Sequence, residues 1–228
     1  MATNKPAASP VQVVAVVSKM VLPVLDTDFL IPDGVSFSSL ILSIMCSSSS
    51  MKEIFLQNDG FLDKEIIPAS ELSSNQRPIN QHWSWDKILR SVFIKQADVL
   101  QGLYFFENYF SESVIKENVE YYEPLTVHES SLSPSIHSIL FSKINNHKKA
   151  YEMYLRTARL DLDDYNHEVH EGLHITSMAG TWLSIVEGFG GVRVNENGLK
   201  FKPIIPEQWQ SFCFNIMYRN QRVKFDIK

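Results

Sequence analysis

Residues 133–160 read SPSIHSILFSKINNHKKAYEMYLRTARL, and the first half of this stretch has a clear helix start. Ser133 followed by Pro134 is typical of such a start, because serine can cap the first turn and proline lacks an N–H that this turn does not need. Apolar residues then recur at helical spacing, at Ile136, Ile139, Leu140 and Ile144. We therefore expect a helix that begins at Ser133.

A second helix is predicted directly after the first, over residues 148–160. Its charged residues recur every four positions, at Lys148, Glu152 and Arg156. The residues expected to face inward are Tyr151, Tyr154, Leu155 and Ala158. Similar patterns occur at 85–92, 99–106 and 179–186, and we expect Gly188 to end the last of these. The chain is thus predicted to be mainly α.

The pattern changes near the C-terminus. Aromatic and aliphatic residues alternate with other residues over 212–218 and again over 223–227, with Arg219-Asn220-Gln221 between them. This arrangement predicts a β-hairpin. Because an isolated two-stranded hairpin is at best marginally stable, it must pack on the helices or belong to a larger sheet.

Composition excludes several classes of function. The chain has 228 residues, of which 44% are hydrophobic, and a formal net charge of -5. Without a basic excess, binding to nucleic acid is not expected as a main role. The apolar runs 11–25 and 37–46 are too short and interrupted to span a bilayer, so no membrane association is expected. We interpret residues 1–50 as a loosely ordered leader in preference to an export signal.

The two cysteines, Cys46 and Cys213, lie far apart and have no redox or metal-ligand spacing. We expect both to be buried and reduced. Reduced thiols favour a cytoplasmic location.

Two hydroxyl-rich segments precede predicted helices. One is His128-Glu129-Ser130-Ser131, and the other is the run from Gly172 to Ser177, which contains His174. A helix N-terminus offers unpaired N–H groups and a positive dipole end, so both segments could bind one phosphate together. Ordinary capping of the two helices is the alternative.

Histidines offer a third candidate site. His167, His170 and His174 could bind a metal ion if they lay on one continuous helix, but Gly172 falls between the last two and favours a loop. Lys95-Gln96 is the fourth candidate, although a single lysine usually marks a solvated helix face. From these patterns alone, neither site is preferred.

Several longer segments resemble glycoside hydrolase family 65, which includes the maltose and kojibiose phosphorylases. The resemblance lies in DGFLD at 59–63, RPINQHWSWD at 77–86, FIKQADVL at 93–100, YEPLTVHESSLSP at 122–134, the run 150–165, HITSMAGTW at 174–182 and GFGG at 188–191. It covers about residue 51 to the C-terminus, and the first fifty residues resemble nothing in the family.

The resemblance implies a fold and its boundaries. Family members have an (α/α)6 barrel, a helical toroid, followed by a small C-terminal β-sandwich. Residues 1–50 would then be a separate N-terminal segment, 51–196 the C-terminal part of the barrel and 197–228 the beginning of the β domain. The resemblance also implies a possible homodimer.

The resemblance further implies an inverting phosphorolysis. An α-linked glucose disaccharide reacts with inorganic phosphate and gives β-glucose 1-phosphate, without any cofactor or metal. By motif, Lys95 and Gln96 would bind the glucose unit, while Ser130, Ser131, His174 and Ser177 would bind phosphate. Such a reaction requires a carboxylic acid that protonates the departing oxygen.

One departure from the family limits what can be carried over. The general acid of the family is a glutamate in a Gly-Pro-Asp-Glu-Tyr type motif, and this sequence contains no such motif. We therefore assign no catalytic residue and expect an incomplete fragment of a phosphorylase. A non-catalytic protein that binds carbohydrate or phosphate is the alternative, and a histidine-rich metal protein is a weaker one.

Overall fold

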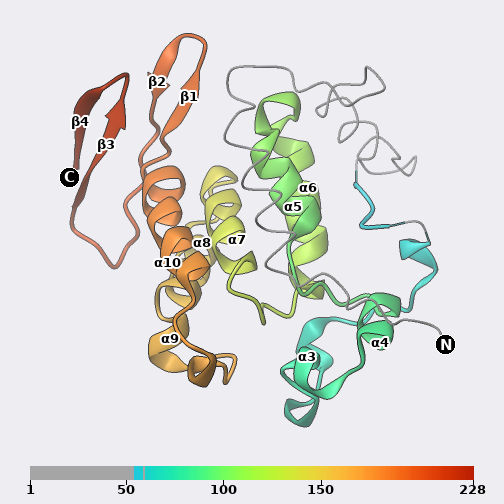
Figure 1. Ribbon diagram of the computed structural model, residues 1–228. Coiled ribbons are helices and arrows are strands. Elements are labelled where there is room, and N and C mark those ends of the chain that lie inside the picture. Colours follow the sequence, from blue (N-terminus) through green and yellow to red (C-terminus); the bar gives the residue numbers. More distant parts are fainter. Residues whose placement is uncertain (1–53, 59) are drawn as a thin grey trace, which may run out of the picture. The chain divides into compact units, whose positions relative to one another are not determined.

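Helix α7 (Ser133–Lys143) lies at the centre of the helices in the computed structural model, which describes residues 54–58 and 60–228 (Figure 1). All residues from Ser133 to Ser142 are buried. The helices that pack against it are α5 (Asp98–Phe105), α6 (Glu112–Tyr122), α8 (His147–Ala158) and α10 (Ile175–Leu183). A helix surrounded in this way needs no polar face.

Helix α7 begins at Ser133 as predicted, but its N-cap lies one residue earlier than the serine expected to cap it. Leu132 is the N-cap, and no side chain caps the helix. The Ser133 hydroxyl is buried and has no hydrogen-bond partner in the described part of the chain. The preceding loop takes over part of this role, because the Leu132 N–H donates to Ser130 Oγ at 3.2 Å.

Helix α8 follows α7 after a short turn, as predicted, but its buried face is different. Asn146 caps the helix by accepting a hydrogen bond from the Lys149 N–H. The buried residues are Ala150, Met153 and Thr157, whereas the four residues expected to face inward are only half-buried. Tyr151 and Tyr154 are held at the side of the helix, because their rings pack against Trp209.

The remaining helical elements are short or lie at the edges of this group. The α-helices are α3 (Ile79–His82), α4 (Trp85–Arg90) and α9 (Leu160–Asp163). The 3-10 turns are Phe61–Asp63, Ala69–Glu71, Ser74–Gln76, Glu107–Tyr109, Glu123–Leu125 and Val169–Glu171. No helix in the described residues is long and apolar enough to cross a membrane.

Helix α10 does not end where the sequence suggested. It continues as a π-helix over Ser184–Phe189, so Gly188 lies inside the helical segment. Gly180 is required for close packing, since a Cβ there would lie 2.6 Å from the Ser135 side chain. The absence of a side chain at Gly180 thus lets α10 approach α7.

Two antiparallel hairpins follow the helices. Strands β3 (Phe212–Tyr218) and β4 (Gln221–Ile227) form the predicted hairpin, with Phe214 opposite Phe225. The pairing of β1 (Arg193–Asn195) with β2 (Gly198–Lys200) was not predicted. The change from helix to strand therefore begins before residue 197. Helices followed by short sheets confirm the predicted fold class.

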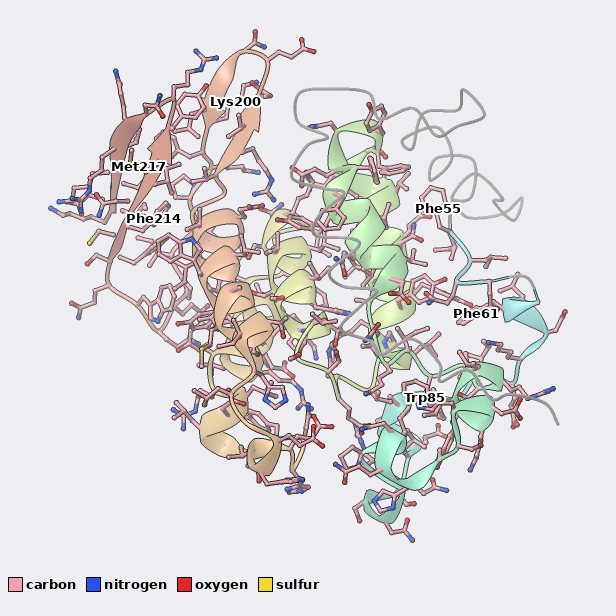
Figure 2. All side chains as sticks on the ribbon, in the orientation of Figure 1. Phe55, Phe61, Trp85, Lys200, Phe214 and Met217 are labelled. Atoms are coloured by element: carbon pink, nitrogen blue, oxygen red, sulfur yellow. The ribbon has the colours of Figure 1, made fainter. Side chains whose placement is uncertain are left out.

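The β3–β4 hairpin packs on the helices through a shared apolar cluster. Its buried members are Val186, Val192, Phe214, Phe225 and Ile227. Figure 2 shows Phe214 and Met217 on β3, and Met217 is 69% exposed on the outer face of that strand. Cys213 is a free cysteine, but it also faces outward, so the expectation that it is buried was wrong. Cys46 and the predicted leader lie outside the described residues.

The turn between β3 and β4 allows a stability test. Arg219 and Asn220 have φ angles of 49° and 61°, as in a tight hairpin turn with two left-handed residues. Asparagine and glycine tolerate this conformation, whereas a β-branched residue does not. We expect Asn220→Val to lower the free energy of unfolding by about 1–2 kcal/mol, and Asn220→Gly to change it much less. Urea unfolding of both variants tests this, and equal losses would contradict the backbone explanation.

Candidate functional site

The two predicted sugar-binding residues lie beside the loop that holds the predicted phosphate-binding serines. Ile94 forms an isolated parallel bridge with Thr126. In this bridge the Ile94 N–H donates to the Leu125 carbonyl at 2.9 Å, and the Val127 N–H donates to the Ile94 carbonyl at 3.0 Å. Lys95 and Gln96 follow directly and are half-buried. Sequence alone did not predict this bridge, because a single backbone pair leaves no pattern.

Glu129 ties this loop to residues 77–79. Its carboxylate accepts hydrogen bonds from Arg77 Nε and from the Ile79 N–H, both at 2.6 Å. Arg77 Nη2 also donates to the Val127 carbonyl at 2.6 Å. Glu129 is 3% exposed and Ile79 is fully buried, so water cannot replace these bonds easily. The carboxylate therefore fixes the backbone on both sides.

Arg156 of α8 also supports this loop. Its Nε and Nη2 donate to the His128 carbonyl at 3.0 and 2.8 Å. His128 has a φ of 54°, which is unusual for a residue other than glycine. The guanidinium thus helps to hold the unusual backbone conformation that directly precedes Glu129 and the two serines.

Ser130 and Ser131 keep their hydroxyl protons available. Ser130 Oγ accepts from the Leu132 N–H, and Ser131 Oγ accepts from Thr176 Oγ1 at 2.8 Å. Each serine is the acceptor in its bond, and neither hydroxyl has an acceptor among the described residues. Such hydroxyls can donate to an anion. The Thr176 bond also brings the 128–131 loop into contact with the start of α10.

His174 lies at the start of α10 and is held by Asp161. The imidazole Nδ1 lies 2.5 Å from Asp161 Oδ1, and the His174 backbone N–H donates to Asp161 Oδ2 at 2.9 Å. Ser177 is placed differently from the two loop serines. It is 2% exposed, and its hydroxyl donates to the Thr157 carbonyl at 3.0 Å. Its side chain is therefore engaged in the core.

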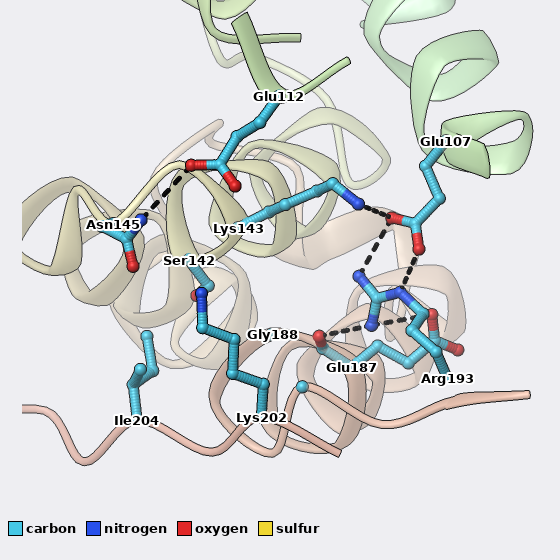
Figure 3. A pocket seen from close by; sticks show the side chains of 11 residues that line it. Glu107, Glu112, Ser142, Lys143, Asn145, Glu187, Gly188, Arg193, Lys202 and Ile204 are labelled. Carbon is cyan, nitrogen blue, oxygen red and sulfur yellow. Dashed lines mark hydrogen bonds and ion pairs between the residues drawn. The ribbon is translucent and has the colours of Figure 1, made fainter. Parts of the chain in front are cut away.

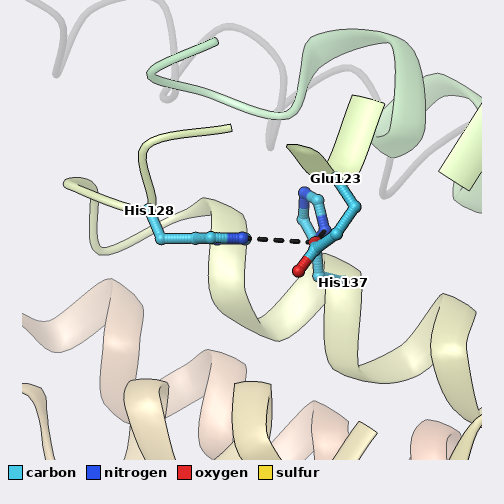
Figure 4. A group of neighbouring side chains, drawn as sticks. All are labelled: Glu123, His128 and His137. Atoms are coloured by element: carbon cyan, nitrogen blue, oxygen red, sulfur yellow. Dashed lines mark hydrogen bonds and ion pairs between the residues drawn. The ribbon is translucent and has the colours of Figure 1, made fainter. Parts of the chain in front are cut away.

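The three histidines considered as metal ligands do not share a helix. His167 and His170 are exposed, and Gly172, with a φ of 114°, ends the 3-10 turn Val169–Glu171. A different group, Glu123, His128 and His137, has donor atoms within 4.8 Å of one another (Figure 4). Among residues 54–58 and 60–228, no other group of three or more possible metal ligands lies this close together.

The geometry of this cluster favours a buried charge network. His128 Nε2 lies 3.2 Å and His137 Nδ1 lies 2.6 Å from the same oxygen, Glu123 Oε2. Lys149 Nζ lies 3.4 Å from the other oxygen. Although burial opposes ionisation, the two imidazoles hold the pKa of Glu123 well below its ordinary value of 4.5. Because the ammonium group of Lys149 already pairs with the Glu123 carboxylate, binding of a metal cation at the same carboxylate is disfavoured, and we propose no metal site here.

The cluster makes stability depend on pH. Burial, opposed by the hydrogen bond to Glu123, lowers the pKa of His128 from its ordinary 6.5 to about 4. The unfolded chain therefore binds the proton first, and stability is lost as pH falls from 6.5 toward 4. Below pH 4.5 the protonation of Glu123 in the unfolded chain adds to the loss. We expect the His128 contribution to reach roughly 2–3 kcal/mol.

Urea unfolding over this pH range checks the prediction. His128→Gln should flatten the dependence between pH 6.5 and 4, because the substituted side chain does not titrate. His170→Gln, at an exposed position, is the matched control and should leave the dependence unchanged. A His128 variant with the wild-type dependence would contradict the assignment.

A cavity of about 200 Å³ lies elsewhere, lined by helical residues together with Arg193 of β1 and with Lys202 and Ile204 after β2 (Figure 3). Its charged lining includes Glu107, Lys143, Glu187 and Arg193, and none of the predicted site residues lines it. Glu107 pairs with both Lys143 and Arg193. These charges neutralise one another, which favours a structural role.

Sequence reasoning missed the residues that support the site. Arg77, Glu129, Arg156 and Asp161 act through partners 13 to 52 positions away. Glu129 belongs to the hydroxyl-rich segment 128–131, but the local sequence does not reveal that it pairs with Arg77. Asp161 stands in a run of acidic residues at 161–164, a pattern that on its own is typical of a solvated surface.

Comparison with known proteins assigns the family. The model of the glycosyl hydrolase family 65 central catalytic domain matches residues 36–183, and that of its C-terminal domain matches residues 192–228. The first match begins earlier than residue 51, where the resemblance in the sequence was expected to start.

Relatives among characterised proteins are phosphorylases. The chain is 55% identical over 175 residues to maltose phosphorylase of Bacillus subtilis, covering 77% of this chain and 23% of that protein. It is 44% identical to an α,α-trehalose phosphorylase of Thermoanaerobacter brockii, with the same two shares. For kojibiose phosphorylase of Halothermothrix orenii the identity is 38%, again over 77% of this chain and 23% of the relative.

One solved structure carries the provisional assignment of kojibiose phosphorylase, from the human microbiome. It is 43% identical and has a TM-score of 0.70, covering 76% of this chain and 24% of that one. The chain spans about a quarter of the length of these relatives. The two family matches together cover most of the sequence, and the chain belongs to glycosyl hydrolase family 65.

Proposed function

We propose that this chain binds inorganic phosphate and an α-linked glucose disaccharide, as the binding part of a phosphorolysis that gives β-glucose 1-phosphate. The observation that carries the proposal is the contact between the two hydroxyl-rich helix starts, through Thr176 and Ser131. This contact supports the proposal that two serine hydroxyls and the His174 imidazole serve one anion. Maltose is the first sugar to test, since the maltose phosphorylase of Bacillus subtilis is 55% identical.

In this proposal Ser130 and Ser131 donate to phosphate oxygens, and the imidazole of His174 contacts the same anion. Lys95 and Gln96 bind the glucose unit from the neighbouring segment. Ser177, which was expected to bind phosphate, instead fixes the first turn of α10 through Thr157. We further propose that the helical domain is followed by the beginning of the β domain, with the boundary a few residues before the expected residue 197, because β1 already starts at Arg193.

The reaction transfers a glucosyl unit from the glycosidic oxygen to a phosphate oxygen with inversion. The bond to the departing sugar breaks as the bond to phosphate forms, and the departing oxygen takes up a proton. No residue of this chain is assigned to donate that proton, because the glutamate motif expected for it is absent from the sequence. A protein that binds phosphate and sugar without turnover is therefore the second candidate.

Calorimetry and a turnover assay together test the two candidates. Phosphate should bind to the purified chain, and Ser131→Ala should weaken binding about tenfold, as expected for one lost hydrogen bond to a charged group. Ser211→Ala, at an exposed position outside the site, is the control. Binding with formation of β-glucose 1-phosphate from maltose supports the phosphorylase, and binding without product supports the second candidate. No binding of phosphate or maltose overturns both.

A further inference from the structure

The candidate phosphate-binding imidazole lies between two carboxylates from different segments. Asp161, on α9, contacts Nδ1 of His174 at 2.5 Å. Glu168, in the loop before α10, has Oε2 3.8 Å from Nε2 of the same ring. All three side chains are largely buried, with 15–20% of their surface exposed. The two ring nitrogens therefore face two different acidic groups.

Asp161 holds His174 through both of its carboxylate oxygens. One carboxylate oxygen meets the ring and the other accepts the backbone N–H of the same residue, so both the position and the tilt of the imidazole are fixed. Although burial opposes it, these two hydrogen bonds hold the pKa of Asp161 below its ordinary value. An ionised carboxylate only accepts, which requires the proton to be on Nδ1.

The contact with Glu168 is looser. Its separation of 3.8 Å is longer than a hydrogen bond, and Asn80 Nδ2 donates to Glu168 Oε1 at 3.1 Å. The carboxylate thus lies near Nε2 but is held by Asn80 of α3. A negative group near Nε2 attracts the doubly protonated ring and also repels an incoming anion.

We propose that Asp161 is a positioning residue that keeps Nδ1 of His174 protonated and turns Nε2 toward the bound anion, while Glu168 competes with that anion. With Nδ1 fixed as a donor, Nε2 can donate only when the ring carries both protons. An unprotonated phosphate oxygen can accept from Nε2 only in that doubly protonated state, in which the charge of the ring is opposite to that of the anion. The part that concerns phosphate rests on the proposed function.

The position of the proton is tested first, without any ligand. Two-dimensional NMR that correlates ring carbons and nitrogens in the wild-type chain should show a protonated Nδ1 on His174 between about pH 6 and 9, a range in which Asp161 is ionised. The His174 signals are assigned by their loss in His174→Gln. A ring with its proton only on Nε2 would overturn the positioning role, whether or not phosphate binds.

Phosphate calorimetry with matched variants tests the rest. Asp161→Asn should weaken phosphate binding roughly tenfold, the effect expected for one oriented hydrogen bond to a charged group. Glu168→Gln should strengthen it. Asp163→Asn, in the same short helix but paired with Arg159, should leave it unchanged. Weakening by Glu168→Gln, or equal effects of the two aspartate variants, would overturn the inference.

The two proposals fail in different ways. If the wild-type chain bound no phosphate while Nδ1 proved to be protonated, the proposed function and the competing role of Glu168 would fall, and the positioning by Asp161 would stand. Near-ultraviolet circular dichroism of each variant shows whether its fold is intact. Asp161→Glu provides a second test that keeps the charge, and it should retain more phosphate affinity than Asp161→Asn if the variant folds.

Discussion

Replacing Glu129 by alanine should lower the free energy of unfolding by roughly 3–4 kcal/mol, because the carboxylate supports two segments at once. The substitution leaves the buried Ile79 N–H without an acceptor and removes the ion pair with Arg77. The Arg77 side chain is 33% exposed and can recover some hydration, so the loss should not exceed this range. Urea unfolding monitored by circular dichroism measures it.

Two further variants show which part of the effect is electrostatic. Glu129→Gln keeps a carbonyl acceptor for the Ile79 N–H but loses the charge, so its loss should be smaller than that of Glu129→Ala. Glu120→Ala is the matched control, since Glu120 is 60% exposed and lies 3.8 Å from Lys116. Its effect should stay within about 0.5 kcal/mol. A Glu129→Ala loss no larger than this control would contradict the supporting role.

The same variant should disturb the candidate site. Residues 127–131 are held both by the contacts of Glu129 and by those of Arg156. Losing one support should let the serine hydroxyls move, and phosphate affinity should fall even at temperatures at which the chain remains folded. Affinity unchanged in a folded Glu129 variant would show that the loop is held without this carboxylate.

Local sequence patterns predicted the main elements because local interactions form them. The α7–α8 pair follows from a proline near one helix start and from the spacing of apolar and charged residues, and the structure adds Asn146 as the cap of the second helix. The β3–β4 hairpin follows from alternation and from two turn residues, of which asparagine tolerates positive φ. In each case the decisive interactions lie within a few residues.

Features that depend on tertiary contacts could not be predicted in this way. The π-helix after α10 packs against α7 and contributes Val186 to the cluster under the hairpin, and neither contact leaves a periodic signal. Ser133 was expected to cap α7, but the loop places Ser130 at the neighbouring backbone N–H. The candidate site behaves likewise: its binding residues were expected by resemblance, whereas Asp161 was found from its contacts with His174.

Replacing Arg193 by alanine should be as damaging as the loss of Glu129, at about 3 kcal/mol or more. Arg193 begins β1, and its guanidinium pairs with Glu107, at 2.5 Å from Nε and 3.3 Å from Nη2. Its Nη1 also donates to the Glu187 and Val192 carbonyls at 2.7 and 2.9 Å. The substitution leaves Glu107, which is 8% exposed, with Lys143 as its remaining cation.

The pH dependence provides an independent check on this pair. Burial raises the pKa of Glu107, but Arg193 and Lys143 outweigh it and hold the pKa below its ordinary 4.5. The stabilisation is therefore present above pH 4.5 and is lost as pH falls through the lower pKa of the folded chain. In the Arg193→Ala chain this dependence should weaken, since one of the two cations is gone.

A double-mutant cycle separates the ion pair from the other contacts of Arg193. If the pair dominates, the double variant Arg193→Ala/Glu107→Ala should be little less stable than Arg193→Ala alone, because the charge left unpaired in the single variant is no longer present. If the carbonyl contacts dominate, the two single losses should add. Arg193→Lys keeps the charge but not the planar fork and should fall between wild type and alanine. Arg219→Ala, at an exposed position on the β3–β4 turn, is the control and should have little effect. An Arg193→Ala loss no larger than that of this control would contradict the structural role of Arg193.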